Sequence, residues 1–463
     1  MGRLFGTDGV RGLAVSELTT EVAMLIGRAA AYTLGRDGKR CKKLLIGRDT
    51  RESCGILEAA LAAGVCSCGT DAHILGIVPT PAVAALTVMY GADAGVMISA
   101  SHNTFEFNGI KLFNSKGHRL TLSQEQEIER LVFDAQDQML PRGVPQIGRV
   151  YTEKNAEWDY IRKLLKDSEA NLDKLRIIID AANGAAYSSA EKLFSCLGAR
   201  VRLINASPDG RNINMHCGST DVLALRQAVL ETKAQAGIAL DGDGDRCLMI
   251  DEAGNLLDGD RLLAILALHM KKRGRLSSNT CVVTPMTNLG FFPWARENGI
   301  VVTKTPDVGG GHVFERMVQD GYNLGGEQSG FIIQRDYSTT GDGLLLGAAV
   351  LDIMQSRKCL LSELAQVFRP YPQITVNVPL RAECRGIWKD VPDIIGIIEH
   401  CRSSLGDDGR IYVRESGTEP VLRIMAEGRN GEAVRGCAEA IARIAEKYLE
   451  IPLDRRILTG ESS

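Results

Sequence analysis

Residues 93–113 read DAGVMISASHNTFEFNGIKLF. Residues 94–99 are a short apolar run typical of a buried strand, and the run gives way to the tripeptide Ser-His-Asn at 101–103. Lys111 follows ten residues after Ser101, inside a second apolar run. A strand that delivers a hydroxyl to a loop, with a lysine nearby, can present a nucleophile. The alternative is that the tripeptide only forms a turn, because small polar residues favour turns.

The composition indicates a multidomain globular protein. A chain of 463 residues is too long for one hydrophobic core and predicts three or four domains. Its net charge of −3 speaks against a broad basic surface for nucleic acid. The sequence shows neither an apolar run long enough to span a bilayer nor a signal peptide, so we expect a cytoplasmic protein without a membrane partner. The twelve cysteines lack Cys-x-x-Cys spacing, which favours reduced thiols.

One unit recurs three times: an apolar strand, a polar loop, and a helix. Consecutive apolar, β-branched residues are typical of parallel strands that are covered on both faces. The pattern therefore predicts three similar α/β domains. The predicted strands and helices are 42–46 with 55–64, 175–180 with 188–197 and 200–204, and 281–284 with 292–298 and 300–304.

The C-terminal part has a different texture. An alternating strand is followed by helix, strand, strand and helix, which is an α+β order. The predicted elements are 374–378, 392–402, 411–414, 421–427 and 432–448. The predicted domains are 1–148, 149–250 and 251–368, all α/β, and the α+β domain 369–463.

An acidic loop follows the apolar residues 236–240. It reads DGDGDR, so that Asp241, Asp243 and Asp245 alternate with glycines before Arg246. Three like charges on a tight loop repel each other, and a bound cation explains their placement. A few oxygens from one loop suit Mg²⁺ shared with a phosphate better than a calcium cage. The alternative is a solvated acidic turn.

Three further loops carry polar groups between glycines. Residues 414–420 read RESGTEP and, with Arg423, form a predicted anion cradle, with a polar hairpin as the alternative. Residues 325–330 read GGEQSG and suit sugar hydroxyls, and residues 5–12 read FGTDGVRG and offer Arg11. A Walker A loop, a dinucleotide GxGxxG motif, a GxSxG elbow and an HExxH motif are all missing from the sequence. Together these features indicate phosphoryl transfer on a small polar substrate.

The ordered motifs FGTDGVRG, SASHN, DGDGDR, GGEQSG and RESGTEP span nearly the whole chain and resemble the α-D-phosphohexomutase superfamily. The first motif, NGIKLF, and TTGDG at 339–343 are most similar to its bacterial phosphoglucosamine mutase branch. The resemblance implies four domains around a central cleft. It also implies conversion of glucosamine 6-phosphate to glucosamine 1-phosphate through a sugar 1,6-bisphosphate. These sugar phosphates would be the only partners implied, and a homodimer is one option for the assembly.

The resemblance also assigns roles. Ser101 would carry a phosphoryl group and would hold one Mg²⁺ per site together with Asp241, Asp243 and Asp245, while Arg246 would offset the charge of the phosphoserine. Lys111, Arg11 and His102 would assist proton transfer and charge balance. Glu327 and Ser329 would bind the sugar hydroxyls. The phosphate that is not reacting would be bound by Arg414, Ser416, Gly417, Thr418 and Arg423.

The chain departs from the superfamily pattern in its sugar-recognition parts. Thr104 replaces a proline, Phe107 an acidic residue, and Phe331 a histidine. Residues 307–313 read DVGGGHV where the superfamily usually shows a run like KVGDRYV. Two alternatives therefore stay open: a mutase for a different sugar phosphate, or a non-catalytic relative that binds phosphosugars.

Overall fold

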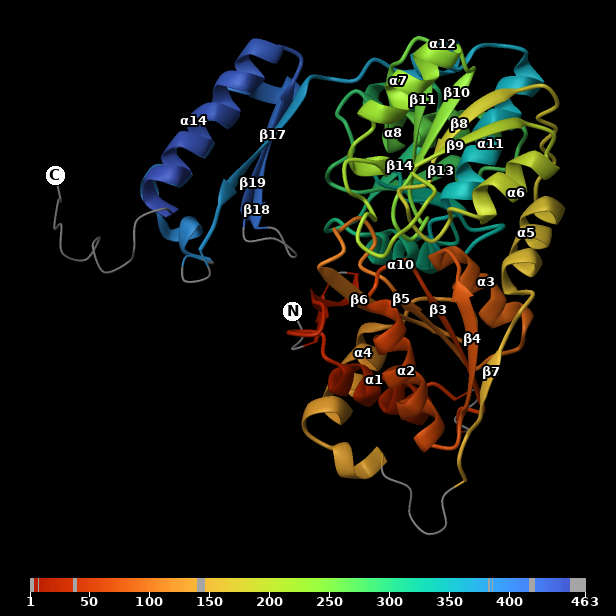
Figure 1. The fold of residues 1–463 in the computed structure, drawn as a ribbon. Coiled ribbons are helices and arrows are strands. Elements are labelled where there is room, and N and C mark those ends of the chain that lie inside the picture. Colours follow the sequence, from red (N-terminus) through yellow and green to blue (C-terminus); the bar gives the residue numbers. More distant parts are fainter. Residues whose placement is uncertain are drawn as a thin grey trace, which may run out of the picture. The chain divides into compact units, whose positions relative to one another are not determined.

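The structure is a computed structural model of the chain, and it describes residues 4–6, 8–35, 40–139, 146–381, 384, 386–415 and 421–449. The chain falls into two compact units (Figure 1). The first comprises Met1–Thr287 and Glu297–Val367, and the second comprises Asn288–Arg296 and Phe368–Ser463.

The first unit begins with a sheet that has seven strands within the described residues. Its spatial order is β1-β2-β6-β5-β3-β4-β7. β3 is parallel to β4 and β5, whereas β6 is antiparallel to both of its neighbours, β2 and β5. The strands are β1 (Phe5–Gly6), β2 (Gly9–Leu13), β3 (Lys43–Arg48), β4 (Asp71–Ile77), β5 (Ala94–Ile98), β6 (Phe107–Asn114) and β7 (Val150–Thr152).

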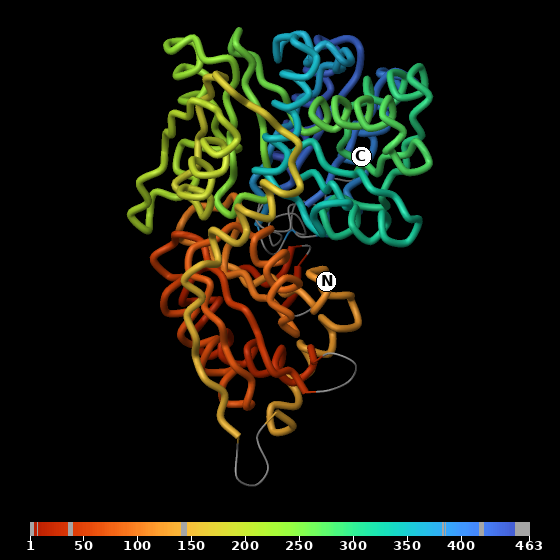
Figure 2. Tube along the Cα trace, turned by 90° about the vertical axis from the view of Figure 1, so that its right-hand side faces the viewer, coloured from red at the N-terminus to blue at the C-terminus, as the bar shows by residue number. Residues whose placement is uncertain are grey.

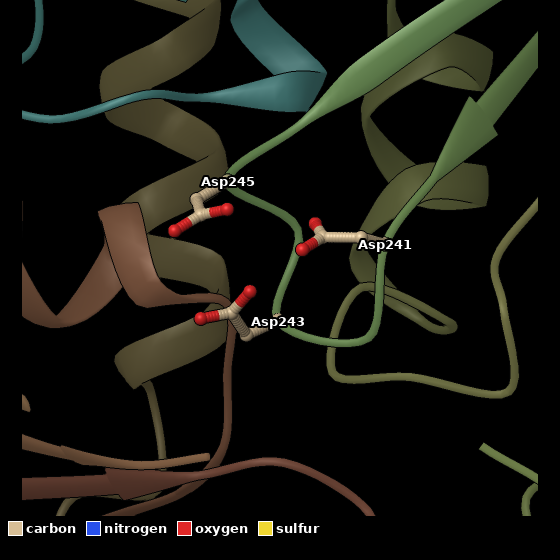
Figure 3. A group of neighbouring side chains, drawn as sticks. All are labelled: Asp241, Asp243 and Asp245. Carbon is tan, nitrogen blue, oxygen red and sulfur yellow. The ribbon is translucent and has the colours of Figure 1, made fainter. Parts of the chain in front are cut away.

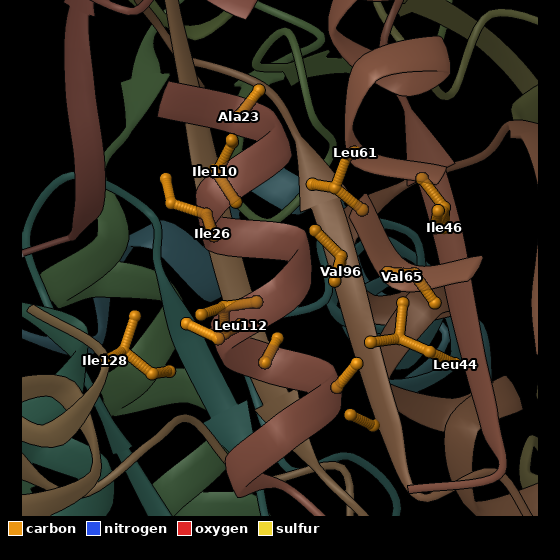
Figure 4. Packing of buried hydrophobic residues seen from close by; sticks show 14 of the residues in the cluster. Ala23, Ile26, Leu44, Ile46, Leu61, Val65, Val96, Ile110, Leu112 and Ile128 are labelled. Atoms are coloured by element: carbon orange, nitrogen blue, oxygen red, sulfur yellow. The ribbon is translucent and has the colours of Figure 1, made fainter. Parts of the chain in front are cut away.

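Helices cover this sheet, and its core lies beneath α1 and α2. The helices are α1 (Thr20–Thr33), α2 (Cys54–Ser67), α3 (Thr80–Met89) and α4 (Leu122–Phe133). Figure 4 shows Ile26 of α1 and Leu61 of α2 packing beside the strands that carry Val96 and Ile110. α1 and α2 approach closely because a Cβ at Gly27 would lie only 2.5 Å from the Leu61 carbonyl oxygen.

Two more sheets complete the first unit. One has the order β12-β11-β10-β8-β9, and the other has the order β14-β13-β15-β16. Their strands are β8 (Arg176–Asp180), β9 (Arg200–Ile204), β10 (Ala236–Leu240), β11 (Cys247–Asp251), β12 (Leu256–Leu257), β13 (Thr280–Val283), β14 (Val301–Lys304), β15 (Leu324–Gly326) and β16 (Ile332–Gln334). The helices are α5 (Ala156–Asp167), α6 (Ser189–Cys196), α7 (Leu223–Thr232), α8 (Gly259–Lys272), α10 (Gly310–Asp320), α11 (Gly343–Arg357) and α12 (Leu361–Leu364). The reader can follow β7 into α5 in Figure 2.

The second unit has its own sheet and core. Its antiparallel sheet runs β17-β19-β18, with β17 (Gln373–Pro379), β18 (Gly409–Glu415) and β19 (Val421–Gly428). α13 (Pro392–Leu405) and α14 (Gly431–Leu449) pack on it around a shared apolar core. The short helix α9 (Phe291–Glu297) belongs largely to this unit, where Phe291 and Trp294 contact Phe368.

The predicted fold class is confirmed: α/β sheets fill the first unit and an α+β arrangement fills the second. The expectation of parallel strands holds only in part. The pairs β5–β6, β10–β11 and β15–β16 are antiparallel. The prediction was wrong for these pairs because a continuous apolar run indicates that a strand is buried on both faces but does not indicate the direction of its neighbour. Among the described residues, none of the helices is both long enough and apolar enough to cross a membrane.

Candidate active site

The first sheet brings Ser101 and Lys111 to the same place. β5 is buried along its whole length and ends at Ile98, and β6 returns beside it with Met97 opposite Lys111. Ser101 lies in the connecting loop with a φ of +52° and is fully buried. The predicted strand, loop and lysine are therefore found as the sequence pattern indicated.

The acidic loop joins the antiparallel strands β10 and β11. Figure 3 shows the carboxyl groups of Asp241, Asp243 and Asp245 turned toward one another, and one ligand atom of each lies within 4.8 Å of the others. All three are buried, and Ser101 Oγ donates a hydrogen bond to Asp241 Oδ2 at 2.7 Å. The loop comes this close because Gly242 has no side chain: a Cβ there would lie 2.5 Å from the Ser101 carbonyl oxygen.

The three carboxylates differ in how well nearby positive charge compensates them. Burial raises the pKa of Asp241 well above its usual range, and the charges of Asp245 and Asp243 raise it further. The pKa of Asp245 is raised by burial and by Asp243. Burial acts on Asp243 in the same direction, but Lys111 outweighs it and lowers the pKa of Asp243 to about 2. The charged forms of Asp241 and Asp245 are therefore disfavoured by their surroundings, and a bound cation would stabilise them.

These residues fit a metal ion. Lys111 Nζ lies 2.8 Å from Asp243 Oδ2 and 2.9 Å from Asp245 Oδ2. The Oδ1 atoms of Asp243 and Asp245 are buried and have no hydrogen-bond partner among the described residues. Buried oxygens without a partner are costly, and a cation that accepts carboxylate ligands would satisfy them. The arrangement can hold a hard divalent metal.

A second charged cluster surrounds Asp8. Its carboxylate contacts the guanidinium groups of Arg11 and Arg119, and it lies 3.3 Å from Lys111 Nζ. Burial raises the pKa of Asp8, but Lys111, Arg119 and Arg11 outweigh this effect and hold the pKa well below its usual range. Arg11 also donates to Asn103 Oδ1 at 2.9 Å, so this cluster extends to the loop of Ser101.

His102 is partly buried and lies near the positive charges of Arg246 and Arg11. Arg246, burial and Arg11 together lower the pKa of His102 to about 2. Its Nδ1 is buried and has no hydrogen-bond partner among the described residues. The imidazole is therefore neutral at physiological pH.

The predicted sugar loop lies between β15 and β16. Glu327 Oε1 accepts a hydrogen bond from the Gly309 amide at 2.9 Å, and burial raises the pKa of Glu327 although Arg246 opposes this. Ser329 Oγ is buried without a partner among the described residues. Phe331 is 4% exposed and packs with Val313 and Phe314 in an apolar cluster, so it offers no polar group.

The predicted phosphate loop belongs to the second unit. Arg414 on β18 is directly opposite Arg423 on β19. The other residues predicted to bind this phosphate, Ser416, Gly417 and Thr418, lie outside the described residues.

Sequence reasoning missed several residues that shape the site. Asp8 stood in the same motif as Arg11, at a spacing of three, and that spacing could have identified it. Thr80 begins α3 and donates to Asp243 Oδ2 at 2.5 Å, and Asn214 donates to the Ser101 carbonyl at 2.8 Å. A single sequence carries no local signal for these two residues, because they approach from distant segments.

Comparisons with family models cover most of the chain. The phosphoglucomutase/phosphomannomutase models match as alpha/beta/alpha domain I at residues 2–139, domain II at 158–254, domain III at 258–371 and the C-terminal domain at 374–444.

Curated relatives match over nearly the full length. The phosphoglucosamine mutase of Caldicellulosiruptor bescii is 45% identical over 453 residues, which is 97% of this chain and 100% of the relative. The phosphoglucosamine mutase of Acetivibrio thermocellus is 45% identical over 450 residues, again 97% of this chain and 100% of the relative.

Solved structures share the fold. A phosphoglucomutase/phosphomannomutase family protein from Burkholderia thailandensis has a TM-score of 0.79 at 24% identity and covers 96% of this chain and 97% of its own. The N-acetylphosphoglucosamine mutase of Aspergillus fumigatus, in complex with GlcNAc-6P and magnesium, has a TM-score of 0.65 at 17% identity and covers 96% and 95%. With four domain models matched in order and relatives that are alike from end to end, this chain belongs to the phosphoglucomutase/phosphomannomutase family.

Proposed function

We propose that this chain is an isomerase that interconverts glucosamine 6-phosphate and glucosamine 1-phosphate through a phosphorylated Ser101. The observation that carries the proposal is the 2.7 Å hydrogen bond from Ser101 Oγ to Asp241 Oδ2, in a buried site where three carboxylates converge. The substrate is supported by the relatives at 45% identity that bear the name phosphoglucosamine mutase.

The proposed reaction has two phosphoryl transfers. In the first, the O1 hydroxyl of glucosamine 6-phosphate attacks the phosphorus on Ser101. A new O–P bond forms, the bond to Ser101 Oγ breaks, the O1 proton passes to the site, and Ser101 Oγ regains a proton. In the second, Ser101 Oγ gives up its proton and attacks the 6-phosphate of the 1,6-bisphosphate. O6 leaves and takes up a proton, and glucosamine 1-phosphate is released.

Each residue of the site supports a part of this chemistry. Mg²⁺, one per site and held by Ser101, Asp241, Asp243 and Asp245, would offset the charge of the phosphoryl group. Arg246 Nε lies 4.0 Å from Asp241 Oδ2 and adds positive charge beside the serine. Burial of Ser101 keeps bulk water from a phosphoryl group bound there, which favours transfer to a sugar over hydrolysis.

The remaining roles are proposals of the same kind. Lys111, Arg11 and His102 assist proton transfer and charge balance. Glu327 and Ser329 bind the sugar, and Arg414, Ser416, Gly417, Thr418 and Arg423 bind the distal phosphate. The boundaries 1–148, 149–250, 251–368 and 369–463 stay a prediction for the four domains.

The test is turnover with purified protein, Mg²⁺ and a trace of glucosamine 1,6-bisphosphate. We expect isomerisation of glucosamine 6-phosphate, phosphoserine at Ser101 by mass spectrometry, and loss of both in Ser101→Ala. The variant Ser67→Ala is the matched control, because Ser67 lies at the C-terminal end of α2, where its Oγ donates to the Gly64 carbonyl at 2.7 Å. Full isomerase activity in Ser101→Ala would contradict the mechanism.

A second candidate is the same chemistry on another sugar phosphate. The observation that favours it is the buried Phe331. It replaces the histidine that the superfamily usually shows, so position 331 offers no polar group to a sugar. This candidate predicts a higher kcat/KM on glucose 6-phosphate or mannose 6-phosphate than on glucosamine 6-phosphate. A panel of the three substrates separates the two candidates.

A further inference from the structure

Arg51 is a buried arginine in the turn between β3 and α2, with 1% of its surface exposed. A guanidinium has five N–H donors, and each of them has an acceptor here. Nε donates to Asp49 Oδ2 at 2.9 Å. The other four donate to backbone carbonyls of the loop that carries the serine: Ser101 at 3.0 Å, Asn103 at 2.8 Å, Phe107 at 3.0 Å, and Thr104.

Asp49 holds the same loop from its other end. Its Oδ2 accepts from Ser99 Oγ at 2.5 Å, and Ser99 Oγ accepts from the Ser101 amide at 2.9 Å. Asp49 and Arg51 form an ion pair at 2.9 Å in which both side chains are fully buried. The pair therefore fixes the amide and the carbonyl of Ser101 at the same time.

A second donor reaches the loop from a distant segment. Asn214 Nδ2 donates to the carbonyls of Ser101 and Asn103, both at 2.8 Å. These two carbonyls are also acceptors for Arg51, so both of their lone-pair directions are used. Arg51 and Asn214 thus enclose the backbone of the loop.

These hydrogen bonds stabilise an unfavourable backbone conformation at Ser101. A non-glycine residue at φ +52° is in a conformation that the chain leaves unless its surroundings fix it. The loop also carries Thr104 where the superfamily usually has a proline, so it lacks the rigidity that a proline ring would add.

We propose that Arg51 and Asn214 are positioning residues, which keep Ser101 Oγ directed at Asp241 through both phosphoryl transfers. The proposal rests on the proposed function. A misplacement of about 1 Å can cost a reaction roughly 100-fold in rate. Neither residue touches the reacting atoms, so their loss should act on turnover rather than on sugar binding.

The first test compares Arg51→Lys with Arg48→Lys. Lysine keeps the charge beside Asp49 but loses the planar fork that reaches four carbonyls. Arg48 is the matched control, because it is the nearest arginine in the sequence and its side chain points to a different partner. Arg48 Nε lies 3.2 Å from Glu58 Oε2, and Glu58 belongs to α2. For Arg51→Lys we expect kcat to fall at least about tenfold with KM changed less than about twofold. An equal fall in both variants, or wild-type kcat in Arg51→Lys, would overturn the proposal.

The second test protects against a variant that fails to fold. Asn214→Gly removes the amide yet suits the backbone, because Asn214 has a φ of +58°. We expect kcat to fall by about threefold to tenfold, again without a matching change in KM. The amides of Asn103 and Phe107 donate within the loop and report on its order, so their hydrogen exchange should accelerate in this variant. Unchanged kcat and unchanged exchange would overturn the role of Asn214.

The exchange measurement also separates the two proposals. If the wild-type chain proves inactive on every sugar phosphate, the proposed function fails. Arg51→Lys must still loosen residues 101–107 relative to Arg48→Lys, and if it does not, the positioning role fails as well.

Discussion

The ring of Phe331 lies against Gly310 at the start of α10, where a Cβ would stand 2.6 Å from Phe331 Cζ and 2.8 Å from Cδ1. Gly341 borders the same ring, because a Cβ there would lie 2.6 Å from Cδ2. Two departures from the superfamily pattern, the glycine run and the phenylalanine, are therefore one packing arrangement. The glycines leave room for a ring that the usual side chains would exclude.

This packing predicts that Gly310→Ala is destabilising although alanine favours helices. The methyl group would force the Phe331 ring aside, which costs about 1–3 kcal/mol. Gly311→Ala is the matched control in the same helical turn, because a Cβ at Gly311 meets no atom within 4 Å. Calorimetry should show a lower melting temperature for the first variant and an unchanged or higher one for the second. Equal melting temperatures would contradict the packing argument.

The same contact predicts coupling between the two positions. Replacing Phe331 by valine removes the atoms that an alanine at position 310 would meet. In the double variant Gly310→Ala with Phe331→Val, the two changes should interact by about 0.5–3 kcal/mol. A double-mutant cycle in melting temperature measures this interaction between positions 310 and 331. Strictly additive effects of the two substitutions would contradict the predicted coupling.

Asp8 carries a different prediction. Its carboxylate contacts Arg11 and Arg119, so Asp8→Asn leaves like charges facing a neutral amide. We expect a loss of about 1–3 kcal/mol in stability and a fall in kcat of roughly tenfold, or about 1.4 kcal/mol in the activation barrier. Glu399→Gln is a suitable control, because Glu399 forms an i,i+3 ion pair with Arg402 on α13 in which both side chains are exposed. Thermal unfolding and steady-state kinetics on both variants decide the matter.

The loop of Ser101 shows how much the sequence could predict. The apolar run before Ser101 and the return at Lys111 are local patterns, and both were found as strands. The direction of pairing and the contact between Ser101 and Asp241 are not local, because 140 residues separate the two side chains. Before the structure, only the resemblance to a family indicated that Ser101 and Asp241 belong to the same site.

Residues whose side chains bind distant backbone groups could not be identified from local sequence patterns. Arg51 follows β3 as a polar residue in an ordinary turn, and nothing in the sequence marks its five acceptors. Asn214 likewise belongs to a polar stretch without a motif. α9 was predicted as a helix, and it is one, yet its assignment largely to the second unit depends on Phe291 and Phe368, which are far apart in sequence.

A divalent cation should stabilise the protein through the three buried aspartates. At a concentration 100 times its Kd, a ligand that binds only the folded state adds about 2.7 kcal/mol. Mg²⁺ should therefore raise the melting temperature, and EDTA should reverse the increase. The Asp245→Asn variant should lose the increase in melting temperature on addition of Mg²⁺. The Asp173→Asn variant should retain it, because Asp173 is exposed. A shift of the same size in both variants would place the metal elsewhere.

Glu125 in the first turn of α4 predicts a pH dependence. Burial raises the pKa of Glu125 to about 6, with Arg119 opposing and Glu129 and Glu315 adding to the increase. Because the folded state binds the proton more tightly than the unfolded state, this group supports folding at pH 4, and that contribution is lost as the pH rises through 6. The side chain is partly exposed, so solvent screening limits the cost of the charged form at pH 7 to about 1 kcal/mol. Glu125→Gln should therefore raise the melting temperature at pH 7 and leave it unchanged at pH 4, and a ¹³C NMR titration of the Glu125 carboxyl should give a midpoint near 6. An equal effect of the substitution at both pH values would show that the charge of Glu125 is not its cause.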